Sequence, residues 1–215
     1  PAGAQPCYTF DNHDRFRLVS RLNGDGGGLE RGRAGVLLLL GLRGTPFIYY
    51  GAEIGMVDGD VPEDRLRDPA RFFSEGRDPE RTPMQWESSP GRGFSTGEPW
   101  LPYGPADISA AAQHQDPDSM LTLHRRAIWL RKRLPALLHG SYREVESPED
   151  AFVFERREPE SGAVWVGVNT ATETLAVSVP EGAEVILSSG SGAVAAISGT
   201  TLQLPPLAAV WITTS

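Results

Sequence analysis

The fold is decided by two short apolar stretches, CYTF at residues 7–10 and TPFIYY at residues 45–50. The first runs directly into the polar cluster DNHD at residues 11–14. Between the two stretches, residues 30–42 have the apolar content of a helix, and Gly44 is placed to end it. Strand, helix and strand at this spacing predict a βαβ unit, in which the strands are parallel and the helix covers them.

Composition changes near residue 140, and this change predicts two domains, residues 1–139 and 140–215. In the second domain nearly every segment alternates with period two, as in the recurrence of Val164, Val166 and Val168. Such alternation predicts a small antiparallel β-sandwich with one buried face. In the first domain, residues 56–115 form a long segment rich in Pro, Gly, Asp and Arg, and a loop of this length is uncommon unless it is functional.

A helix is predicted just before the composition change, because Pro117 suits a first turn and Pro135 ends the pattern. Its apolar residues recur at three- and four-residue spacing, which predicts one buried stripe: Met120, Leu123, Ala127, Leu130 and Leu134. The same segment carries a basic run, which we expect to be a solvated face: Arg125, Arg126, Arg131, Lys132 and Arg133.

Composition also excludes several classes of function. The net charge of −8 argues against a nucleic-acid partner, and no run of about eighteen apolar residues exists to cross a membrane. The single cysteine, Cys7, rules out an internal disulfide and is expected to be a buried core thiol. The histidines show no metal-ligand spacing and residues 24–28 are a turn rather than a phosphate loop, so we expect neither metal nor nucleotide chemistry.

Three groups of residues carry candidate chemistry. Asn12-His13-Asp14 follows a buried strand, where parallel α/β folds build their sites, although, taken alone, a turn with a helix-capping duty is the more common explanation. Residues 76–86 place arginines and acids around Trp86, which suits sugar recognition, or else form a loop held by its own ion pairs. Residues 44–55 contribute aromatics expected in the barrel core, and Glu53 is expected to be a structural carboxylate.

Together the three groups resemble the α-amylase family, glycoside hydrolase family 13. Residues 8–14 look like its fourth conserved region, on the seventh barrel strand, and residues 45–54 look like its eighth-strand motif. Residues 76–86, followed by 93–94 and 98–101, are similar to the α-glucosidase and oligo-1,6-glucosidase branch. The resemblance covers essentially the whole chain and implies the C-terminal part of a (β/α)8 TIM barrel, strands 7 and 8 with their helices, followed by the small sandwich.

The resemblance also implies roles for three residues. Asp14 would be the family's third carboxylate, which binds hydroxyls of the sugar being cleaved and stabilises the transition state. His13 would hydrogen-bond the same sugar, and Arg77 would grip the non-reducing terminal glucose. The physics agrees, because contacts to the ring 2-hydroxyl strengthen in the oxocarbenium-like transition state and an ionised carboxylate favours the developing positive charge. We therefore expect Arg77 to reach from the long loop and face Asp14 at a glucose-sized cavity.

Two departures from the family pattern bear on activity. Ala52 stands where many relatives carry an acid beside Glu53. More important, the family's nucleophilic aspartate and acid/base glutamate belong to the fourth and fifth strands, which would lie upstream of Pro1. We expect residues 1–215 to be inactive alone and to fold poorly alone, because both barrel strands would present open edges. The chain would then be a fragment of a longer protein, or one piece of a two-chain enzyme.

The leading hypothesis is part of a retaining, exo-acting α-glucosidase that hydrolyses maltose, isomaltose or short oligosaccharides, with no cofactor on this chain. The alternatives are a transglycosylase or isomerase on the same frame, such as a trehalose synthase or sucrose-active relative, and a non-catalytic partner like the amino-acid transporter heavy chains. A carbohydrate-binding module at residues 140–215 is a further alternative, but Trp165 and Trp211 are expected in its core and Tyr142 is a lone exposed aromatic. The chain begins Pro1-Ala2-Gly3, with neither an initiator Met nor a signal-peptide pattern, so we expect the true N-terminus to lie upstream. We expect a cytoplasmic protein, while a signal peptide stays open.

Overall fold

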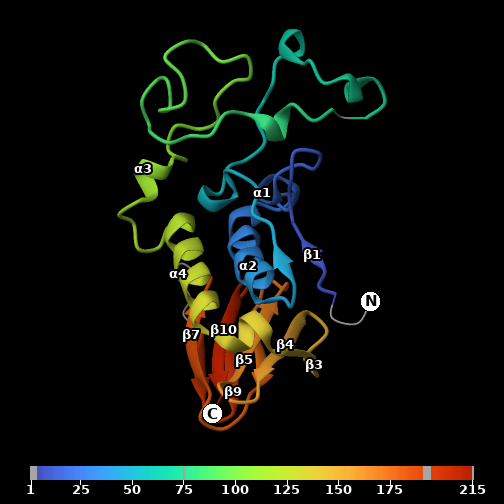
Figure 1. Cartoon of the computed structure of the whole chain (residues 1–215), viewed down its shortest axis with the longest axis vertical. Helices are drawn as coiled ribbons and strands as arrows, with labels where there is room; N and C mark the ends of the chain where they lie inside the picture. Colours follow the sequence, from blue (N-terminus) through green and yellow to red (C-terminus); the bar gives the residue numbers. More distant parts are fainter. Residues whose placement is uncertain (1–3, 75, 191–194, 215) are drawn as a thin grey trace. The chain divides into compact units, whose positions relative to one another are not determined.

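The computed structural model describes residues 4–74, 76–190 and 195–214, so the first three residues of the chain lie outside it. It divides into two compact units (Figure 1). The first, here called the sheet unit, comprises Pro1–Tyr8, Glu30–Phe47 and Leu123–Ser215. The second, the loop unit, comprises Thr9–Leu29 and Ile48–Thr122. The two units interleave along the sequence, and the domain boundary at residues 139/140 stays a prediction.

The predicted parallel strand pair is present in the sheet unit. Strand β1 (Cys7–Tyr8) pairs in parallel with β2 (Thr45–Pro46), and helix α2 (Gly28–Gly41) precedes β2 in the chain. Both strands are shorter than predicted, because the backbone bonds between them end with Phe47 N–H donating to Tyr8 O at 2.8 Å. Gly44 enters β2 where a side chain would not fit, since a Cβ there would lie 2.6 Å from Pro6 O.

Cys7 is exposed, which contradicts the prediction of a buried thiol. Strand β1 is two residues long and, among the described residues, pairs with β2 alone. The prediction was wrong because it rested on the aromatic neighbours Tyr8 and Phe10 in the sequence, and one paired strand does not cover the Cys7 side chain.

Two antiparallel sheets occupy the C-terminal third of the chain. One has five strands in the order β3-β4-β5-β10-β7 and the other three in the order β6-β9-β8. Their bounds are β3 Ser141–Val145, β4 Ala151–Glu158, β5 Gly162–Asn169, β6 Leu175–Ser178, β7 Glu184–Ser188, β8 Ala196–Ser198, β9 Thr201–Leu204 and β10 Ala209–Thr214. One apolar core joins them, with Val153 and Val210 from the larger sheet packed with Val177 and Leu202 from the smaller.

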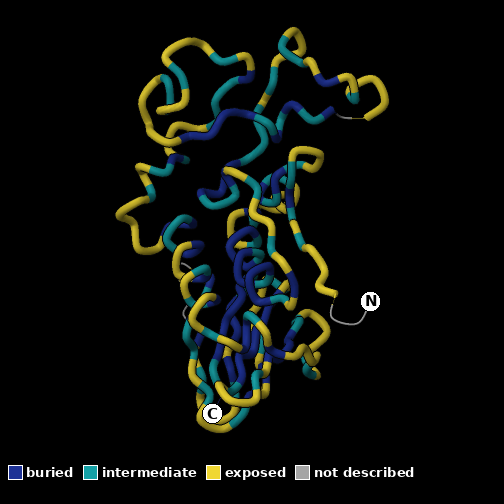
Figure 2. The backbone as a smooth tube through the Cα atoms, in the orientation of Figure 1, coloured by how far each residue is buried: buried dark blue, intermediate teal, exposed yellow. Residues whose placement is uncertain are grey.

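The aromatic residues of these sheets lie where the alternation predicts. Trp211 is fully buried, Trp165 is 8% exposed and Tyr142 is 40% exposed. Figure 2 shows the buried backbone concentrated along β5 and β10. The Trp211 indole N–H donates to Leu37 O of α2 at 3.0 Å, so the helix packs against the five-stranded sheet. Trp165 and Trp211 therefore form core and are not available to stack on a sugar.

The helix predicted before residue 140 is α4 (Met120–Arg133), and Pro135 starts a further short helix, α5 (Pro135–His139). Of the predicted stripe, Met120, Leu123 and Ala127 are buried, whereas Leu130 is half-buried and Leu134 is half-buried and lies just past the end of α4. Arg131 is also buried, at 9% exposure, so the prediction that it belongs to a solvated basic face was wrong.

Arg131 is buried because its guanidinium binds the C-terminal end of α2. It donates to the backbone oxygens of Leu40 and Leu42, and to that of Gly44 at 2.9 Å. The last carbonyls of a helix lack partners within the helix, and a cation there also favours the negative end of the helix dipole. The neighbouring Arg125, Arg126, Lys132 and Arg133 are exposed, as predicted.

The loop unit is built from short pieces rather than regular structure. They are α1 (Leu18–Arg21), α3 (Ala110–Gln113) and the 3-10 turns η1 (Ala52–Ile54), η2 (Glu63–Arg65), η3 (Pro69–Phe72) and η4 (Pro79–Arg81). A small core of Ile54, Met56 and Met84 packs with Ile108 and Leu121. Gln85 adds polar ties, because its side-chain amide donates to Pro105 O and Ile108 O. Within the described residues, none of the helices has the length and apolar character needed to cross a membrane.

Glu155 of β4 gives the sheet unit a measurable pH dependence. Its carboxylate is 5% exposed, accepts hydrogen bonds from Arg157 at 3.0 Å and the Trp165 indole at 3.1 Å, and pairs with Arg143 at 3.3 Å. These donors, Arg157 foremost, lower the pKa of Glu155 to about 2 from its ordinary 4.5.

We predict that Glu155→Gln lowers the free energy of unfolding by on the order of 3 kcal/mol at neutral pH. Since the pKa of the folded state is depressed, the stabilisation is present above pH 4.5 and is lost as the pH falls toward about 2. Urea unfolding between pH 2 and 7 measures the difference, which should shrink to near zero at the acid end. A difference that stays constant across this range would contradict the assignment.

Candidate functional site

The turn after β1 presents two exposed side chains, His13 and Asp14. Asn12 Oδ1 accepts the backbone N–H of Asp14 at 2.8 Å, which closes a local turn of the kind that Asn favours. Asp11 is buried and accepts the backbone N–H of Leu18, the first residue of α1, at 3.2 Å. Asn12 thus closes a turn, and Asp11 binds the first N–H of the helix α1. His13 and Asp14 keep their side chains available, at 69% and 48% exposure.

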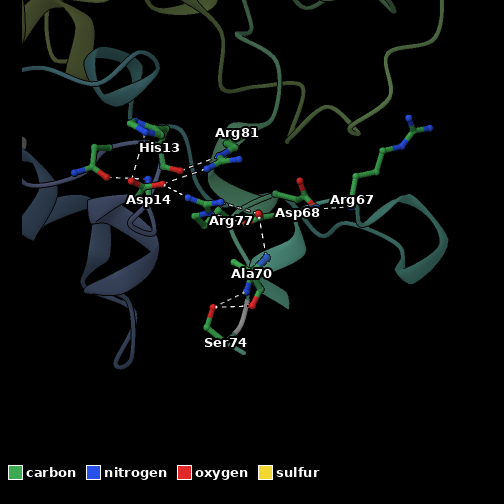
Figure 3. A network of polar contacts seen from close by, with 11 residues as sticks. His13, Asp14, Arg67, Asp68, Ala70, Ser74, Arg77 and Arg81 are labelled. Atoms are coloured by element: carbon green, nitrogen blue, oxygen red, sulfur yellow. Dashed lines mark hydrogen bonds and ion pairs between the residues drawn. The ribbon is translucent and has the colours of Figure 1, made fainter. Parts of the chain in front are cut away.

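Asp14 lies in a cluster of cationic donors (Figure 3). Its Oδ1 accepts from Arg77 Nη1 at 2.7 Å and from Arg81 Nη2 at 3.2 Å. The other oxygen, Oδ2, lies 3.4 Å from His13 Nε2. The hydrogen bond from Arg77 is the main reason that the pKa of Asp14 is lowered, so the carboxylate is ionised at neutral pH. The structure therefore brings together all three residues singled out in the sequence, His13, Asp14 and Arg77.

Two further residues complete this cluster: Arg81, which the sequence analysis placed in the 76–86 group without a role of its own, and Asp68, which it did not single out. Arg81 also donates through Nε to the backbone oxygen of His13 at 2.8 Å. Asp68 accepts from Arg77 Nε at 2.7 Å and from Arg77 Nη2 at 2.8 Å. The signal for Asp68 was the pair Asp68-Pro69, because an acid before a proline is typical of the start of a helical turn. Asp68 does cap η3, accepting the N–H of Ala70 at 3.2 Å.

Beneath the exposed cluster lies a second group of charged residues around Arg17. This residue is fully buried, and its Nη1 donates to Tyr50 O at 2.7 Å. Its guanidinium carbon lies 5.2 Å and 4.9 Å from the ring centres of Tyr49 and Tyr50, within the range of a cation–π interaction. The backbone N–H of Arg17 donates to Asp58 Oδ1 at 2.9 Å. Arg17 thus ties the segment after Asp14 to the end of the TPFIYY stretch.

Glu80 is a buried carboxyl group next to this cluster. Its side chain belongs to η4 and is 1% exposed. Burial raises the pKa of Glu80 to about 7 from its ordinary 4.5, and the neighbouring Asp58 charge adds to the rise. The site consequently holds one carboxyl group, Asp14, that is ionised by its neighbours and another, Glu80, that titrates near neutrality.

An aromatic-lined cavity of about 370 Å³ adjoins the cluster. Trp86, Phe94 and Trp100 line it, each about half exposed, together with Arg81 and Glu53. Trp86 is exposed, as the sequence predicts for an aromatic available to stack on a sugar. Arg81 lines this cavity and also bonds Asp14, whereas His13, Asp14 and Arg77 are not among its lining residues. The placement of Asp14 and Arg77 at a shared glucose-sized cavity therefore stays a prediction.

Comparisons with known proteins identify relatives of the chain. Residues 3–140 match the family model described as "Alpha amylase, catalytic domain". The chain is 34% identical over 198 residues to an oligo-1,6-glucosidase of Heyndrickxia coagulans, and this alignment covers 80% of this chain and 36% of that protein. It is 42% identical over 149 residues to a probable α-glucosidase of Rhizobium meliloti (strain 1021), covering 66% of this chain and 27% of that protein.

Solved structures of similar sequence also superpose on nearly the whole chain. The α-glucosyl transfer enzyme XgtA superposes with a TM-score of 0.86 at 30% identity, covering 98% of this chain and 40% of that one. A trehalulose synthase mutant in complex with Tris superposes with a TM-score of 0.84 at 29% identity, covering 97% of this chain and 43% of that one. The fold and the site thus define a glycoside hydrolase-like protein.

The chain belongs to the α-amylase family, glycoside hydrolase family 13. It spans about a third of the length of the curated relatives it matches, 36% of the first and 27% of the second. The antiparallel sheets and the helices recur in relatives of this family at nearly full coverage of the chain. The predicted family is therefore confirmed.

The titration of Glu80 predicts a second pH effect, opposite in sign to that of Glu155. Because the folded-state pKa of Glu80 is raised, folding binds a proton between pH 4.5 and about 7, and stability falls as the pH rises through this range. Glu80→Gln should stabilise the protein by about 2–3 kcal/mol above pH 7 and have little effect below pH 4.5. Thermal unfolding at pH 4 and pH 8 measures this, with the exposed Glu63→Gln as the matched control. Equal effects at both pH values would contradict it.

Proposed function

We propose that this chain is part of a retaining, exo-acting α-glucosidase that hydrolyses the α-glucosidic bonds of maltose, isomaltose or short oligosaccharides. The observation that carries the proposal is the 2.7 Å ion pair between Arg77 of the long loop and Asp14 of the turn after β1. Curated relatives with 34% and 42% identity carry the names oligo-1,6-glucosidase and probable α-glucosidase.

In this proposal β1 and β2 are the seventh and eighth strands of a (β/α)8 barrel, and residues 140–215 form the β-sandwich that follows it. The parallel pairing of β1 with β2 supports the first assignment, and the core shared by the two antiparallel sheets supports the second. Asp14 and Arg77 then lie at the carboxyl end of the barrel, the face on which such barrels carry their sites.

Asp14 is assigned the binding of sugar hydroxyls and the stabilisation of the transition state. Arg77 keeps its carboxylate ionised, and an ionised group favours the positive charge that develops on the sugar ring. Arg77 is assigned the grip on the non-reducing terminal glucose, and His13 a hydrogen bond to the same sugar. Because Asp14 is already bonded to Arg77, a glucose hydroxyl exchanges with one of these bonds when it binds.

The bond-cleaving carboxylates are assigned to the fourth and fifth barrel strands, which we place in the remaining barrel portion, on the same or a separate chain. Retaining hydrolysis needs a nucleophile and an acid/base about 5 Å apart. This chain would supply sugar recognition and charge stabilisation, and the remaining portion would supply the covalent chemistry. No cofactor is assigned to this chain.

A second candidate function is glucosyl transfer or isomerisation on the same frame. The solved structures that superpose include an α-glucosyl transfer enzyme and a trehalulose synthase. Hydrolysis and transfer share the glucosyl-enzyme intermediate and differ in whether water or a sugar attacks it. Product analysis separates them, because hydrolysis of maltose yields glucose alone, whereas transfer yields products that retain a glucosidic bond.

Residues 1–215 expressed alone should not turn over p-nitrophenyl α-glucoside, whereas the same residues joined to the remaining barrel portion should. The physical reason is the assignment of nucleophile and acid/base outside this chain. Release of p-nitrophenol, followed by absorbance with the joined protein as the positive control, measures the difference. Turnover by residues 1–215 alone would overturn the assignment.

In the joined protein, Asp14→Asn should lower kcat/KM by about 10²–10³-fold, because the charge that favours the transition state is removed while the shape is kept. The effect should appear chiefly in kcat. The exposed Asp107→Asn is the matched control and should leave both constants unchanged. An Asp14→Asn variant with wild-type kcat would remove Asp14 from the proposed machinery.

A further inference from the structure

We propose that Asp68 is a positioning residue, which fixes the Arg77 guanidinium so that one arm points at Asp14 and at the sugar bound there. The proposal deepens the proposed function and rests on it, because it gives Arg77 its role in sugar binding. Asp68 is not expected to touch the substrate, since its side chain is 1% exposed whereas those of Arg77 and Asp14 are 37% and 48% exposed.

The geometry of the guanidinium carries the argument. Asp68 accepts from Nε at 2.7 Å and from Nη2 at 2.8 Å, so it engages one edge of the planar group at two points. Two parallel charge-assisted bonds fix both the plane and the rotation of a guanidinium. The remaining nitrogen, Nη1, then points to Asp14 Oδ1 at 2.7 Å (Figure 3). A long, flexible arginine side chain is thereby held in one orientation before any sugar arrives.

Asp68 is itself held from below by Asp78. The Oδ2 atom of Asp78 accepts the backbone N–H groups of Arg67 at 2.7 Å and of Asp68 at 2.9 Å. Asp78 is 1% exposed and follows Arg77 directly in the chain. Arg77 and Asp78 therefore both bind Asp68, Arg77 through the Asp68 side chain and Asp78 through the Asp68 backbone N–H. Asp68 also accepts the N–H of Ala70, and Pro69 restricts the backbone that follows it.

The competing explanation is that Asp68 only caps the short helix η3. Two substitutions separate these roles. Asparagine caps a helix about as well as aspartate, so Asp68→Asn keeps the bond to Ala70 N–H but loses the charged two-point contact with Arg77. A capping role predicts that Asp68→Asn behaves like the wild type and Asp68→Ala does not. A positioning role predicts that both substitutions impair sugar binding.

The Asp14 carboxyl provides a readout that is independent of catalysis. The hydrogen bond from Arg77 is the largest cause of the lowered pKa of Asp14. If Asp68 positions Arg77, Asp68→Asn weakens this bond, and the pKa of Asp14 rises toward its ordinary value. Removing a negative charge without moving Arg77 has the opposite effect, because the surroundings become more positive and the pKa of Asp14 falls further. Carboxyl ¹³C NMR titration measures the sign, and a fall overturns the proposal.

A double-mutant cycle on the joined enzyme tests the coupling. We expect Asp68→Asn to lower kcat/KM about 10–100-fold, mainly through a higher KM, because Arg77 binds the sugar in both ground and transition states. In an Arg77→Gln background the same substitution should change kcat/KM by less than about 3-fold, since the residue it positions is gone. Independent, multiplicative effects overturn the proposal. The exposed Asp64→Asn of the same segment is the matched control and should stay at the wild-type level.

Failure of this inference is distinguishable from failure of the proposed function. If Arg77→Gln leaves kcat/KM at the wild-type level, the role of Arg77 in sugar binding is wrong, and the Asp14 titration alone judges whether Asp68 positions Arg77. If Arg77→Gln impairs the enzyme and Asp68→Asn does not, the role of Arg77 stands and the inference about Asp68 is overturned.

Discussion

The ion pair between Arg77 and Asp14 joins segments that are 63 residues apart in the chain. An exposed ion pair contributes little to stability by itself, because water screens it and long side chains lose freedom to form it. Here the surrounding structure fixes both partners, Asp14 through the Asn12 turn and Arg77 through the fork on Asp68. The pair is therefore a product of the fold rather than a cause of it, as the proposed role in sugar binding requires.

Local patterns in the sequence predict what depends on neighbours in the chain. The parallel strand pair, the buried stripe of α4 and the alternation of the C-terminal sheets follow from spacing alone. The juxtaposition of Asp14 and Arg77 was also expected, but from the family resemblance rather than from spacing. The burial of Arg131 could not be predicted, because its partners are backbone carbonyls about ninety residues away, which leave no mark on composition. The role of Asp68 could not be predicted for a similar reason, because its pairing with Arg77 depends on the path of a loop that Asp78 fixes.

The error on Cys7 has a different origin, and it bears on the nature of the chain. The apolar character of residues 7–10 predicts burial, yet among the described residues β1 has a neighbouring strand on one edge alone and Cys7 is exposed. An apolar strand with an open edge is one that further strands of the proposed barrel would cover. This is consistent with a chain that spans about a third of its curated relatives.

The charges of the loop unit suggest how the proposed division of labour operates. The exposed guanidinium group of Arg77 and the guanidinium group of Arg81 both donate to Asp14 Oδ1, and Arg77 is in turn bonded to Asp68. A cationic frame of this kind keeps Asp14 ionised without requiring the carboxylate to be buried, so its negative charge faces outward, where a sugar would bind. Preorganised charge costs no reorganisation when the transition state forms, and this is why electrostatic stabilisation is usually the largest single contribution to catalysis. In this proposal the loop contributes to catalysis because it holds the Arg77 guanidinium in one orientation before the sugar binds.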